Sequence, residues 1–292
     1  MARILDEGYY YKRYNVFKRY CKQEEEGLQT LQTYLPIRIE KLINSSVEKQ
    51  HEFKILSVGS GTGDVDLKFV EILLEELKKH SSDDQNTTIY LRVVEPNSSS
   101  CKQFSDAVEA RRDLPIHIDI RAQTFDEYIQ IEQNAGIAFD IIYFIHSIYF
   151  IEEEKAIPYC LEEILKDRGC LFFMYSDEGM LKQVSFEIER RSNDRLIKFT
   201  EKKGPKLIEI VEKLDWKYEV HSHQNCIDVS EIVVGSDSGD LLLDFITHEV
   251  DFRKNADASL VDRVLAVTKN ASFVKDGKYL CMKTDTLLVV HK

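Results

Sequence analysis

The sequence lacks the cysteine patterns of disulfide-rich and zinc-binding proteins. Its six cysteines are scattered over 292 residues and include no Cys-x-x-Cys pair. A disulfide framework or a structural zinc site is therefore not expected. Scattered cysteines fit a reducing compartment better, so we expect a cytoplasmic protein.

Long apolar runs and an excess of basic charge are also missing. No uninterrupted apolar run approaches the roughly 20 residues that span a bilayer, and residues 1–7 lack the apolar core of a signal peptide. Fifty-one acidic residues stand against 39 basic ones, which gives a formal net charge of −12. Because nucleic acids are bound by clustered Lys and Arg, this balance disfavours a nucleic-acid partner. We expect a soluble protein with no membrane or nucleic-acid partner.

One glycine-rich turn organises the rest of the chain. The apolar run Ile55–Val58 leads directly into Gly59-x-Gly61-x-Gly63, and an amphipathic helical pattern starts at Asp64. A strand, a glycine turn and a helix in this order bring backbone N–H groups and a positive helix end close to a ligand. Glycines suit the turn because a Cβ would block that approach or forbid a positive φ.

The spacing of the turn and the acid after it favour a cationic cofactor. The third glycine follows the second by two residues, whereas the dinucleotide fingerprint Gly-x-Gly-x-x-Gly requires three. Asp64 would bring negative charge to a pyrophosphate, but it suits a ligand that carries an amino-acid cation and a sulfonium. We therefore predict S-adenosylmethionine as the cofactor, bound at Gly59, Gly61 and Gly63. A nicotinamide-dependent oxidoreductase is the remote alternative.

Apolar runs and amphipathic segments alternate through the first two thirds of the chain. Strand–helix units repeated in this way predict an α/β fold with a doubly wound parallel sheet. The expected strands are Ile55–Val58, Thr88–Glu95, Ile116–Ile120, Phe139–His146 and Cys170–Tyr175, with helices at Asp64–Lys79 and Ala156–Leu165.

Four regions are expected from these patterns. They are an N-terminal helical lid at 1–50, a cofactor-binding α/β domain at 51–191, an inserted substrate-binding region at 192–275, and a C-terminal hairpin at 276–292. The hairpin would turn around Thr284-Asp285 and add an antiparallel strand to the edge of the sheet. The alternative to a lid is a pair of helices that cover one end of the sheet. Aromatic residues beside a carboxylate, as found near the N-terminus, suit a cationic amine.

Several candidate residues follow predicted strands, where ligands lie in an open α/β sheet. Glu95 ends the second strand and can accept both hydroxyls of a ribose; otherwise it is a surface or helix-capping acid. Thr124 and Phe125 follow the third strand and can contact an adenine, unless Thr124 only caps a helix. His146 ends the most apolar strand, where it is either a substrate contact or a buried histidine.

Motifs of other chemistries are absent from the sequence. It contains no Gly-x-Ser-x-Gly elbow, no His-Glu-x-x-His and no phosphate-binding Gly-x-x-x-x-Gly-Lys-Ser/Thr loop. His221 and His223 lie two residues apart in a predicted strand and therefore share one face of it, but no third metal ligand is evident in the sequence. We therefore expect no metal.

Four dispersed blocks resemble the histamine N-methyltransferase family over essentially the whole chain. The blocks are Ile55–Leu67, Val93–Pro96, Asp140–Ile151 and Gly239–Thr247. The resemblance implies a class I methyltransferase fold, which is Rossmann-like, with an antiparallel C-terminal strand and an auxiliary substrate-binding region. It also implies S-adenosylmethionine as methyl donor and S-adenosylhomocysteine as product.

The resemblance extends the expected cofactor site. Gly59 matches the first cofactor glycine of the family and Glu95 its ribose-binding acid. Ser100 stands where the family has a glutamine, and Phe125, or Thr124 beside it, where the family has an adenine-site serine. The implied site then comprises Gly59, Glu95, Ser100, Thr124, Phe125 and Ile145.

The resemblance also implies an amine pocket, from which this chain departs. Matches to a glutamate, an aromatic pair and a further ring of the family are Glu24, Tyr149, Phe150 and Phe245. Glu25 or Glu26 replaces Glu24 if the gap in the alignment moves. The departures are His146 at a glutamine, Met180 and Val184 at two tryptophans, and Lys283 at a substrate-binding asparagine. The ammonium of Lys283 would repel a protonated amine unless Glu24 or its neighbours pair with it.

These features predict a monomeric N-methyltransferase that acts on a small amine or an imidazole by in-line transfer. We place His146 and Tyr149 at the reacting atoms, with His146 as a hydrogen-bond partner or proton acceptor of the substrate nitrogen. The departures favour an acceptor other than histamine. The alternatives are a catalytically impaired homologue that still binds S-adenosylmethionine, and a small-molecule O-methyltransferase.

Overall fold

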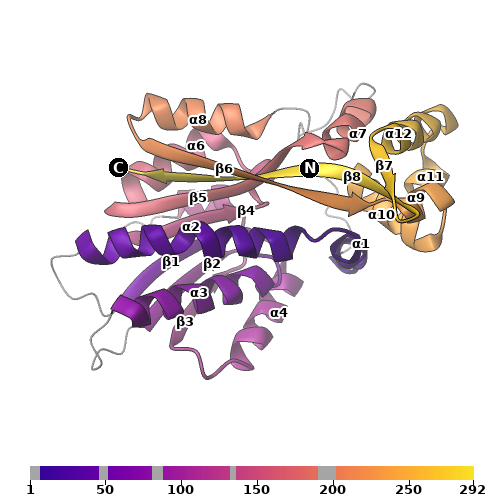
Figure 1. Ribbon diagram of the computed structural model, residues 1–292. Helices are drawn as coiled ribbons and strands as arrows, with labels where there is room; N and C mark the ends of the chain where they lie inside the picture. The colour runs from indigo at the N-terminus through magenta and orange to yellow at the C-terminus, as the bar shows by residue number, and fades with distance from the viewer. Residues whose placement is uncertain (1–6, 46–51, 81–87, 132–135, 190–201) are drawn as a thin grey trace. The chain divides into compact units, whose positions relative to one another are not determined.

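A computed structural model describes residues 7–45, 52–80, 88–131, 136–189 and 202–292 (Figure 1). The chain forms two compact units. We call residues 27–175, 203–221 and 286–292 the sheet unit, and residues 1–26, 176–202 and 222–285 the accessory unit. The division of the chain into four regions stays a prediction, and part of its inserted region, 192–201, lies outside the described residues.

The strands form one sheet in the order β3-β2-β1-β4-β5-β8-β6, with β7 paired to β8. The pairs β3–β2, β2–β1, β1–β4 and β4–β5 are parallel, and β7–β8 is antiparallel. The strands β2 and β3 are added on one side of β1, and β4 and β5 are added on its other side. This change of side is typical of doubly wound folds. The bounds are β1 Glu52–Val58, β2 Thr88–Val94, β3 Ile116–Arg121, β4 Phe139–Ile145, β5 Leu165–Gly179, β6 Lys217–Asp228, β7 Ser272–Lys275 and β8 Lys278–His291.

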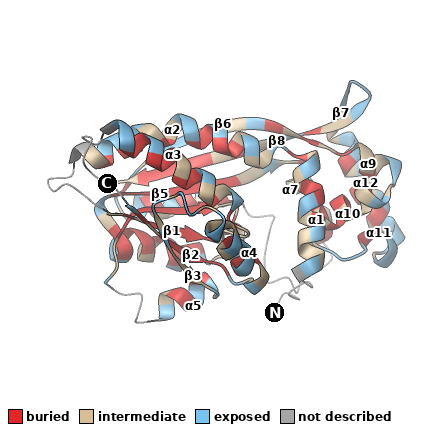
Figure 2. Cartoon of the chain, turned by 90° about the horizontal axis from the view of Figure 1, so that it is seen from below, coloured by how far each residue is buried: buried red, intermediate tan, exposed pale blue. Residues whose placement is uncertain are grey.

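Alternate residues of each central strand face two different hydrophobic cores. In β4, Ile141 and Tyr143 belong to one core, whereas Ile142 and Phe144 belong to the other. Because side chains of a strand alternate with a period of two, an uninterrupted apolar run is required where helices cover both faces. Figure 2 shows the central strands as buried and the outer helix faces as exposed. The predicted doubly wound α/β sheet is confirmed.

Helices cover both faces of the sheet unit (Figure 1). The first core is covered by α2 Gln23–Ser45, α3 Asp64–His80 and α4 Ser98–Glu109. The second core is covered by α5 Phe125–Gln130, α6 Glu153–Pro158, the π-helical turn Tyr159–Ile164 and α8 Lys203–Lys213. The amino end of α3 lies next to the carboxyl end of β1, and that of α4 next to the carboxyl end of β2, because each helix follows its strand in the chain.

The accessory unit is a small helical bundle with its own core. Its helices are α1 Glu7–Tyr20, α7 Met180–Glu189, α9 Ser230–Val234, α10 Asp237–Thr247, α11 Phe252–Asn255 and α12 Ala258–Asn270. Gly239 lets α10 approach α9 closely, since a Cβ on it would lie 2.0 Å from the carbonyl oxygen of Glu231. Met180 and Val184, the two positions where the family has tryptophan, are buried in this core.

The predicted C-terminal hairpin is wrong in two respects. β8 is one continuous strand through Thr284 and Asp285, and the turn lies earlier, at Asp276-Gly277, where both residues have positive φ (52° and 76°). β8 also lies between β5 and β6 rather than at the edge of the sheet. An Asp-Gly pair is a strong turn signal, and β6 already occupies the edge position.

Two absences can be stated for the described part of the chain. None of its helices combines the length and the apolarity that a bilayer crossing requires. No group of three or more His, Cys, Asp or Glu side chains within it is arranged to hold a metal ion. The six cysteines, all at described positions, are free thiols.

Candidate active site

The glycine turn needs each of its glycines, but for different reasons. All three have positive φ: 73° at Gly59, 58° at Gly61 and 80° at Gly63. A Cβ on Gly59 would lie 2.4 Å from the Cβ of Ser147, and one on Gly63 would lie 2.2 Å from the ring of Phe104. At Gly61 a Cβ would meet nothing within 4 Å. Gly59 and Gly63 thus serve packing, whereas Gly61 exposes bare backbone to open space where a ligand can approach.

Glu95 is bound directly to this turn. Its Oε2 atom accepts the backbone N–H of Gly61 at 3.0 Å, and its Oε1 atom accepts the N–H of Asn97 at 2.9 Å. The side chain is only 8% exposed, so it is not the surface acid of the alternative interpretation. Asn97, rather than Glu95, caps α4 by accepting the N–H of Ser100. The structure therefore brings together two groups that the sequence placed 34 residues apart.

A second carboxylate, Asp66, is buried in the first turn of α3, and sequence reasoning missed it. It is 2% exposed and accepts the hydroxyl of Tyr143 at 2.6 Å. The pKa of Asp66 is raised to about 6, because burial and the nearby charge of Glu95 together outweigh the hydrogen bonds from the hydroxyls of Ser57 and Tyr143, which lower it. Burial and the same carboxylate raise the pKa of Tyr143 well above its ordinary value.

The spacing of the buried residues in α3 could have predicted from the sequence that Asp66 faces the core. Asp66, Phe69, Val70, Leu73 and Leu77 are all buried and recur at the three- and four-residue spacing of one helix face. An acid on that face breaks the apolar pattern immediately after the glycine turn. A buried carboxylate with a raised pKa at the mouth of a ligand-binding turn is a candidate functional group.

The segment after β4 contacts the glycine turn. Ser147, which approaches Gly59, also donates its hydroxyl to the carbonyl oxygen of Val58 at 2.5 Å. His146 has a positive φ of 52°, and its Nδ1 atom lies 3.4 Å from the hydroxyl of Tyr149. The loop thus holds His146 and Tyr149 together close to the turn, and their position at the reacting atoms stays a prediction.

Other predicted residues have mixed surroundings in the sheet unit. Phe150 is 56% exposed in the 3-10 turn Ile148–Phe150, while Ile145 is half-buried at the end of β4. Ser100 is fully buried in the first turn of α4. Thr124 caps α5 in a capping box with Glu127, and Phe125 packs against other core rings. Thr124 and Phe125 thus have evident structural roles, and their contacts with an adenine stay predictions.

In the accessory unit, Glu24 and Phe245 share an aromatic neighbour. The hydroxyl of Tyr14 donates to Oε1 of Glu24 at 2.8 Å, and the ring of Tyr14 lies 5.8 Å from that of Phe245. Phe245 also stacks on Phe17, with ring centroids 4.4 Å apart. Lys18 lies 3.7 Å from the same oxygen of Glu24. A carboxylate beside stacked rings is an arrangement that can receive an ammonium group.

Lys283 is neutralised by a partner that the sequence analysis did not name. Its side chain is 2% exposed, and its ammonium bonds to the carboxylate of Asp285, which lies on the same face of β8. Asp285 also accepts the hydroxyl of Ser176 and the amide of Asn225. The carboxylate of Asp285 therefore supplies the charge that the sequence analysis sought at Glu24 or its neighbours.

Comparisons with known proteins identify distant relatives along nearly the whole chain. No protein-family model matches the sequence. Histamine N-methyltransferase of Rattus norvegicus is 24% identical over 287 residues, which cover 94% of this chain and 93% of that protein. Histamine N-methyltransferase A of Xenopus laevis is 24% identical, with 99% and 97% covered, and that of Danio rerio is 25% identical, with 96% of each covered. The chain is a divergent relative of the histamine N-methyltransferases.

Two solved structures, one of them a methyltransferase, share the fold. Loganic acid methyltransferase, solved with S-adenosylhomocysteine, has a TM-score of 0.54 at 8% identity and covers 94% of this chain and 95% of its own. The YcgJ protein from Bacillus subtilis has a TM-score of 0.51 at 12% identity, with 88% and 98% covered. The fold is that of the class I methyltransferases, as the resemblance implied.

Proposed function

We propose that this relative of the histamine N-methyltransferases is an S-adenosylmethionine-dependent methyltransferase that acts on a nitrogen of a small amine or an imidazole. The observation that carries the proposal is the hydrogen bond between Glu95 and the N–H of Gly61. It joins a carboxylate and an open glycine turn at the carboxyl ends of β1 and β2, where ligands of doubly wound sheets bind. Full-length similarity to the histamine N-methyltransferases supports the type of acceptor.

The residues at the turn fit this cofactor in shape and charge. Gly61 leaves room for close approach to the backbone, and the amino end of α3 begins at Asp64. Asp64, Asp66 and Glu95 give this region negative charge, which suits an amino group and a sulfonium better than a pyrophosphate. The carboxylate of Glu95 accepts the N–H groups of Gly61 and Asn97, and a carboxylate has more acceptor sites than these two bonds use, so it can also accept ribose hydroxyls. When bound, S-adenosylmethionine supplies a methyl group that its sulfonium already activates.

The chain's own residues would align the acceptor and manage its proton. A nitrogen attacks through its lone pair, so the acceptor must react as the free base. His146, supported by Tyr149, would hydrogen-bond that nitrogen or take its proton beside the glycine turn. Glu24 and the rings around it would bind the ammonium of the substrate.

The pair formed by Lys283 and Asp285 favours an acceptor that differs from histamine. The pair carries no net charge, so it neither repels an ammonium nor reproduces the amide of the family's asparagine. With Met180 and Val184 also at former tryptophan positions, the acceptor pocket is altered at three of its expected places. The identity of the amine is therefore a separate question from use of the cofactor.

Two measurements test the proposal in order. Calorimetric titration should detect binding of S-adenosylmethionine and of S-adenosylhomocysteine to the full chain. Methyl transfer from tritiated cofactor to a panel of small amines, imidazoles and phenols should then label a nitrogen acceptor. Labelling of phenols alone would identify an O-methyltransferase, and cofactor binding without any transfer would identify an impaired homologue. Absence of cofactor binding at millimolar ligand would refute the proposal.

A further inference from the structure

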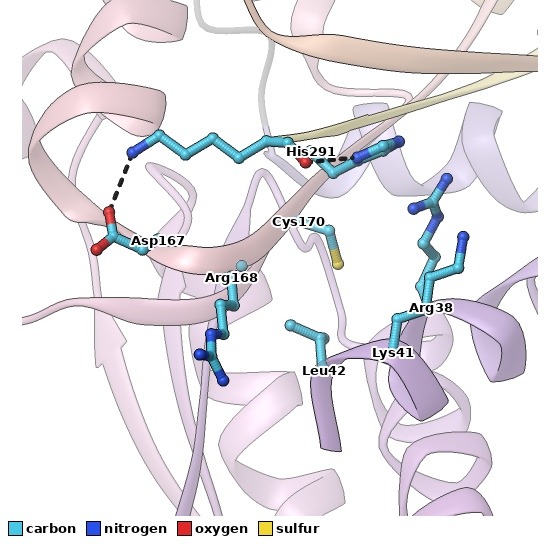
Figure 3. Close-up of a pocket in the computed structure, with 9 residues that line it drawn as sticks. Arg38, Lys41, Leu42, Asp167, Arg168, Cys170 and His291 are labelled. Carbon is cyan, nitrogen blue, oxygen red and sulfur yellow. Dashed lines mark hydrogen bonds and ion pairs between the residues drawn. The ribbon is translucent and has the colours of Figure 1, made fainter. Parts of the chain in front are cut away.

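A small pocket lies at the end of the sheet unit opposite the glycine turn (Figure 3). It encloses about 220 Å³ between α2, the start of the paired part of β5 and the end of β8. Cys170 pairs with Ile141 at the amino end of β4, whereas the glycine turn follows the carboxyl end of β1, a parallel strand. The pocket is therefore separate from the candidate active site.

The lining of this pocket is cationic. It includes Arg38 and Lys41 of α2, Arg168 of β5 and Lys292. Figure 3 shows Arg38 and Lys41 extending toward His291, whereas the side chain of Arg168 lies on the other side of Cys170 and Leu42 and extends away from them. Four cations at one small pocket are unexpected in a chain with 51 acidic and 39 basic residues.

Only part of this positive charge is neutralised. Arg38, which is 5% exposed, forms an ion pair with Glu219, and Lys292 pairs with Asp167 at 3.0 Å. Within the described parts of the chain, Lys41 and Arg168 form no ion pair. Of the four cations that line the pocket, Lys41 and Arg168 are therefore the two whose charge no ion pair within the described residues balances.

His291 lies among the positive charges of this pocket. Burial, together with the charges of Arg38 and Lys41, lowers the pKa of His291 and outweighs the hydrogen bond with the carbonyl oxygen of Lys292 and the charge of Glu219, which raise it. Its imidazole is therefore neutral at physiological pH and adds hydrogen-bonding capacity without adding charge. An anion bound in the pocket would oppose the effect of Arg38 and Lys41 on the pKa of His291.

We propose that this pocket binds the phosphate group of a small ligand, which Arg38 and Lys41 hold and which the positive charge of Arg168 also attracts. Guanidinium and ammonium groups are the usual partners of phosphate oxygens, and a buried arginine is fixed in place before the ligand arrives. The volume of about 220 Å³ is below the ~300–1,000 Å³ of pockets that enclose drug-sized ligands. The site therefore recognises the phosphate itself, and its occupancy stabilises the sheet unit without entering the methyl-transfer chemistry.

Thermal unfolding and calorimetric titration with sodium phosphate, against sodium chloride at equal ionic strength, test this site. Phosphate should bind saturably and raise the melting temperature of the full-length protein. Lys41→Ala and Arg168→Ala, both at exposed positions, should each weaken binding about tenfold or more. Lys213→Ala, at an exposed lysine of α8, is the matched control and should bind as the wild type does.

Glycerol 3-phosphate, which carries no nucleoside that the cofactor site could bind, forms a second arm of the experiment. Equal binding of both probes would show that the pocket reads only the phosphate group, and tighter binding of the ester would identify a phosphate ester as its ligand. Both results support the site. Methyl transfer by the two variants in phosphate-free buffer should equal that of the wild type. Failure of both probes to bind saturably, or binding by the two variants as tight as that of the wild type, would overturn the proposal.

Discussion

Glu95 accepts the backbone N–H of Gly61 at 3.0 Å, and this bond connects the end of β2 with the turn that follows β1. The carboxylate is fixed from two sides, since its other oxygen accepts the N–H of Asn97. A charged acceptor held in this way is ready to bind hydroxyl groups without rearrangement. The predictions below begin from this contact.

Glu95→Ala should weaken binding of S-adenosylmethionine by tenfold or more. The variant loses an anionic acceptor and leaves the N–H of Gly61 without its partner, a loss of about 1.5–3 kcal/mol for hydrogen bonds to charged groups. Calorimetric titration measures the dissociation constant. Glu75→Ala, at an exposed position of α3, is the control, and equal affinities of the two variants would remove Glu95 from the cofactor site.

Asp66→Asn should stabilise the protein at pH 7.5. The folded-state pKa of Asp66 is about 6 against an ordinary value of 3.8, so the folded state holds its proton more tightly than the unfolded chain does. Ionisation of Asp66 therefore destabilises the fold, fully above pH 6 and not at all below about pH 3.8. The difference between 3.8 and about 6 corresponds to a gain of order 3 kcal/mol for the variant at pH 7.5.

Chemical unfolding of both proteins between pH 4 and pH 8 measures this effect. The stability gained by Asp66→Asn should shrink as the pH falls and vanish near pH 4. Asp64→Asn, at the exposed position two residues earlier, controls for the charge change. A variant that is less stable than the wild type at pH 7.5 would contradict the argument from burial.

His146→Asn should lower turnover by about 10²–10⁴-fold while leaving cofactor affinity unchanged. Asparagine is the appropriate substitution because His146 has a φ of 52°, which asparagine tolerates better than alanine does. Single-turnover methyl transfer and calorimetry give the two quantities. Tyr149→Phe removes only the hydroxyl 3.4 Å from Nδ1 and should have a smaller effect in the same direction. Unchanged turnover in His146→Asn would exclude this histidine from the reaction.

Glu24→Gln should raise KM for a cationic amine by about tenfold or more, with little change in kcat. The glutamine keeps an oxygen for the hydroxyl of Tyr14 but removes the negative charge. Steady-state kinetics on any amine that the panel identifies measures the change. Glu25→Gln is the matched control, since its side chain is 74% exposed and pairs with Lys22 at 3.7 Å. A larger effect in Glu25→Gln would reassign the acid that binds the amine.

Lys283→Ala should destabilise the protein by about 3–5 kcal/mol, because Asp285 would remain buried without its cationic partner. Replacing both residues, as Lys283→Met with Asp285→Asn, removes both charges but keeps an oxygen for the donors Ser176 and Asn225, and it should recover most of that loss. Urea unfolding measures both free energies. Comparable loss in the single and the double variant would show that the two charges are not coupled.

Local sequence patterns were sufficient for the sheet and for the glycine turn. Gly59, Gly61 and Gly63 lie within five residues between an apolar run and a helical pattern, so their conformation follows from neighbours in the chain. Glu95 could be placed at the same edge of the sheet because strands of a parallel sheet end together. These are the parts of the site that depend on one strand–helix unit or two adjacent ones.

Contacts between distant segments could not be predicted in the same way. The hydroxyl of Tyr143 meets Asp66 only after β4 has paired with β1, and Asp285 meets Asn225 only through the neighbouring strands β8 and β6. The turn at Asp276-Gly277 was available to local reasoning and was missed, because polar residues at 284 and 285 resembled a turn. Asp285 instead belongs to a buried network with Ser176, Asn225 and Lys283.

Because alternate residues of β4 face two different cores, this strand should be unusually sensitive to the insertion or deletion of a residue. One inserted or deleted residue before Phe144 would exchange the residues that face each helical layer. The same displacement would turn the hydroxyl of Tyr143 away from Asp66 and move His146 out of step with the glycine turn. A single change in length would then disturb both the packing of the cores and the placement of His146. Such changes should therefore be tolerated far less in this strand than in the segments between elements.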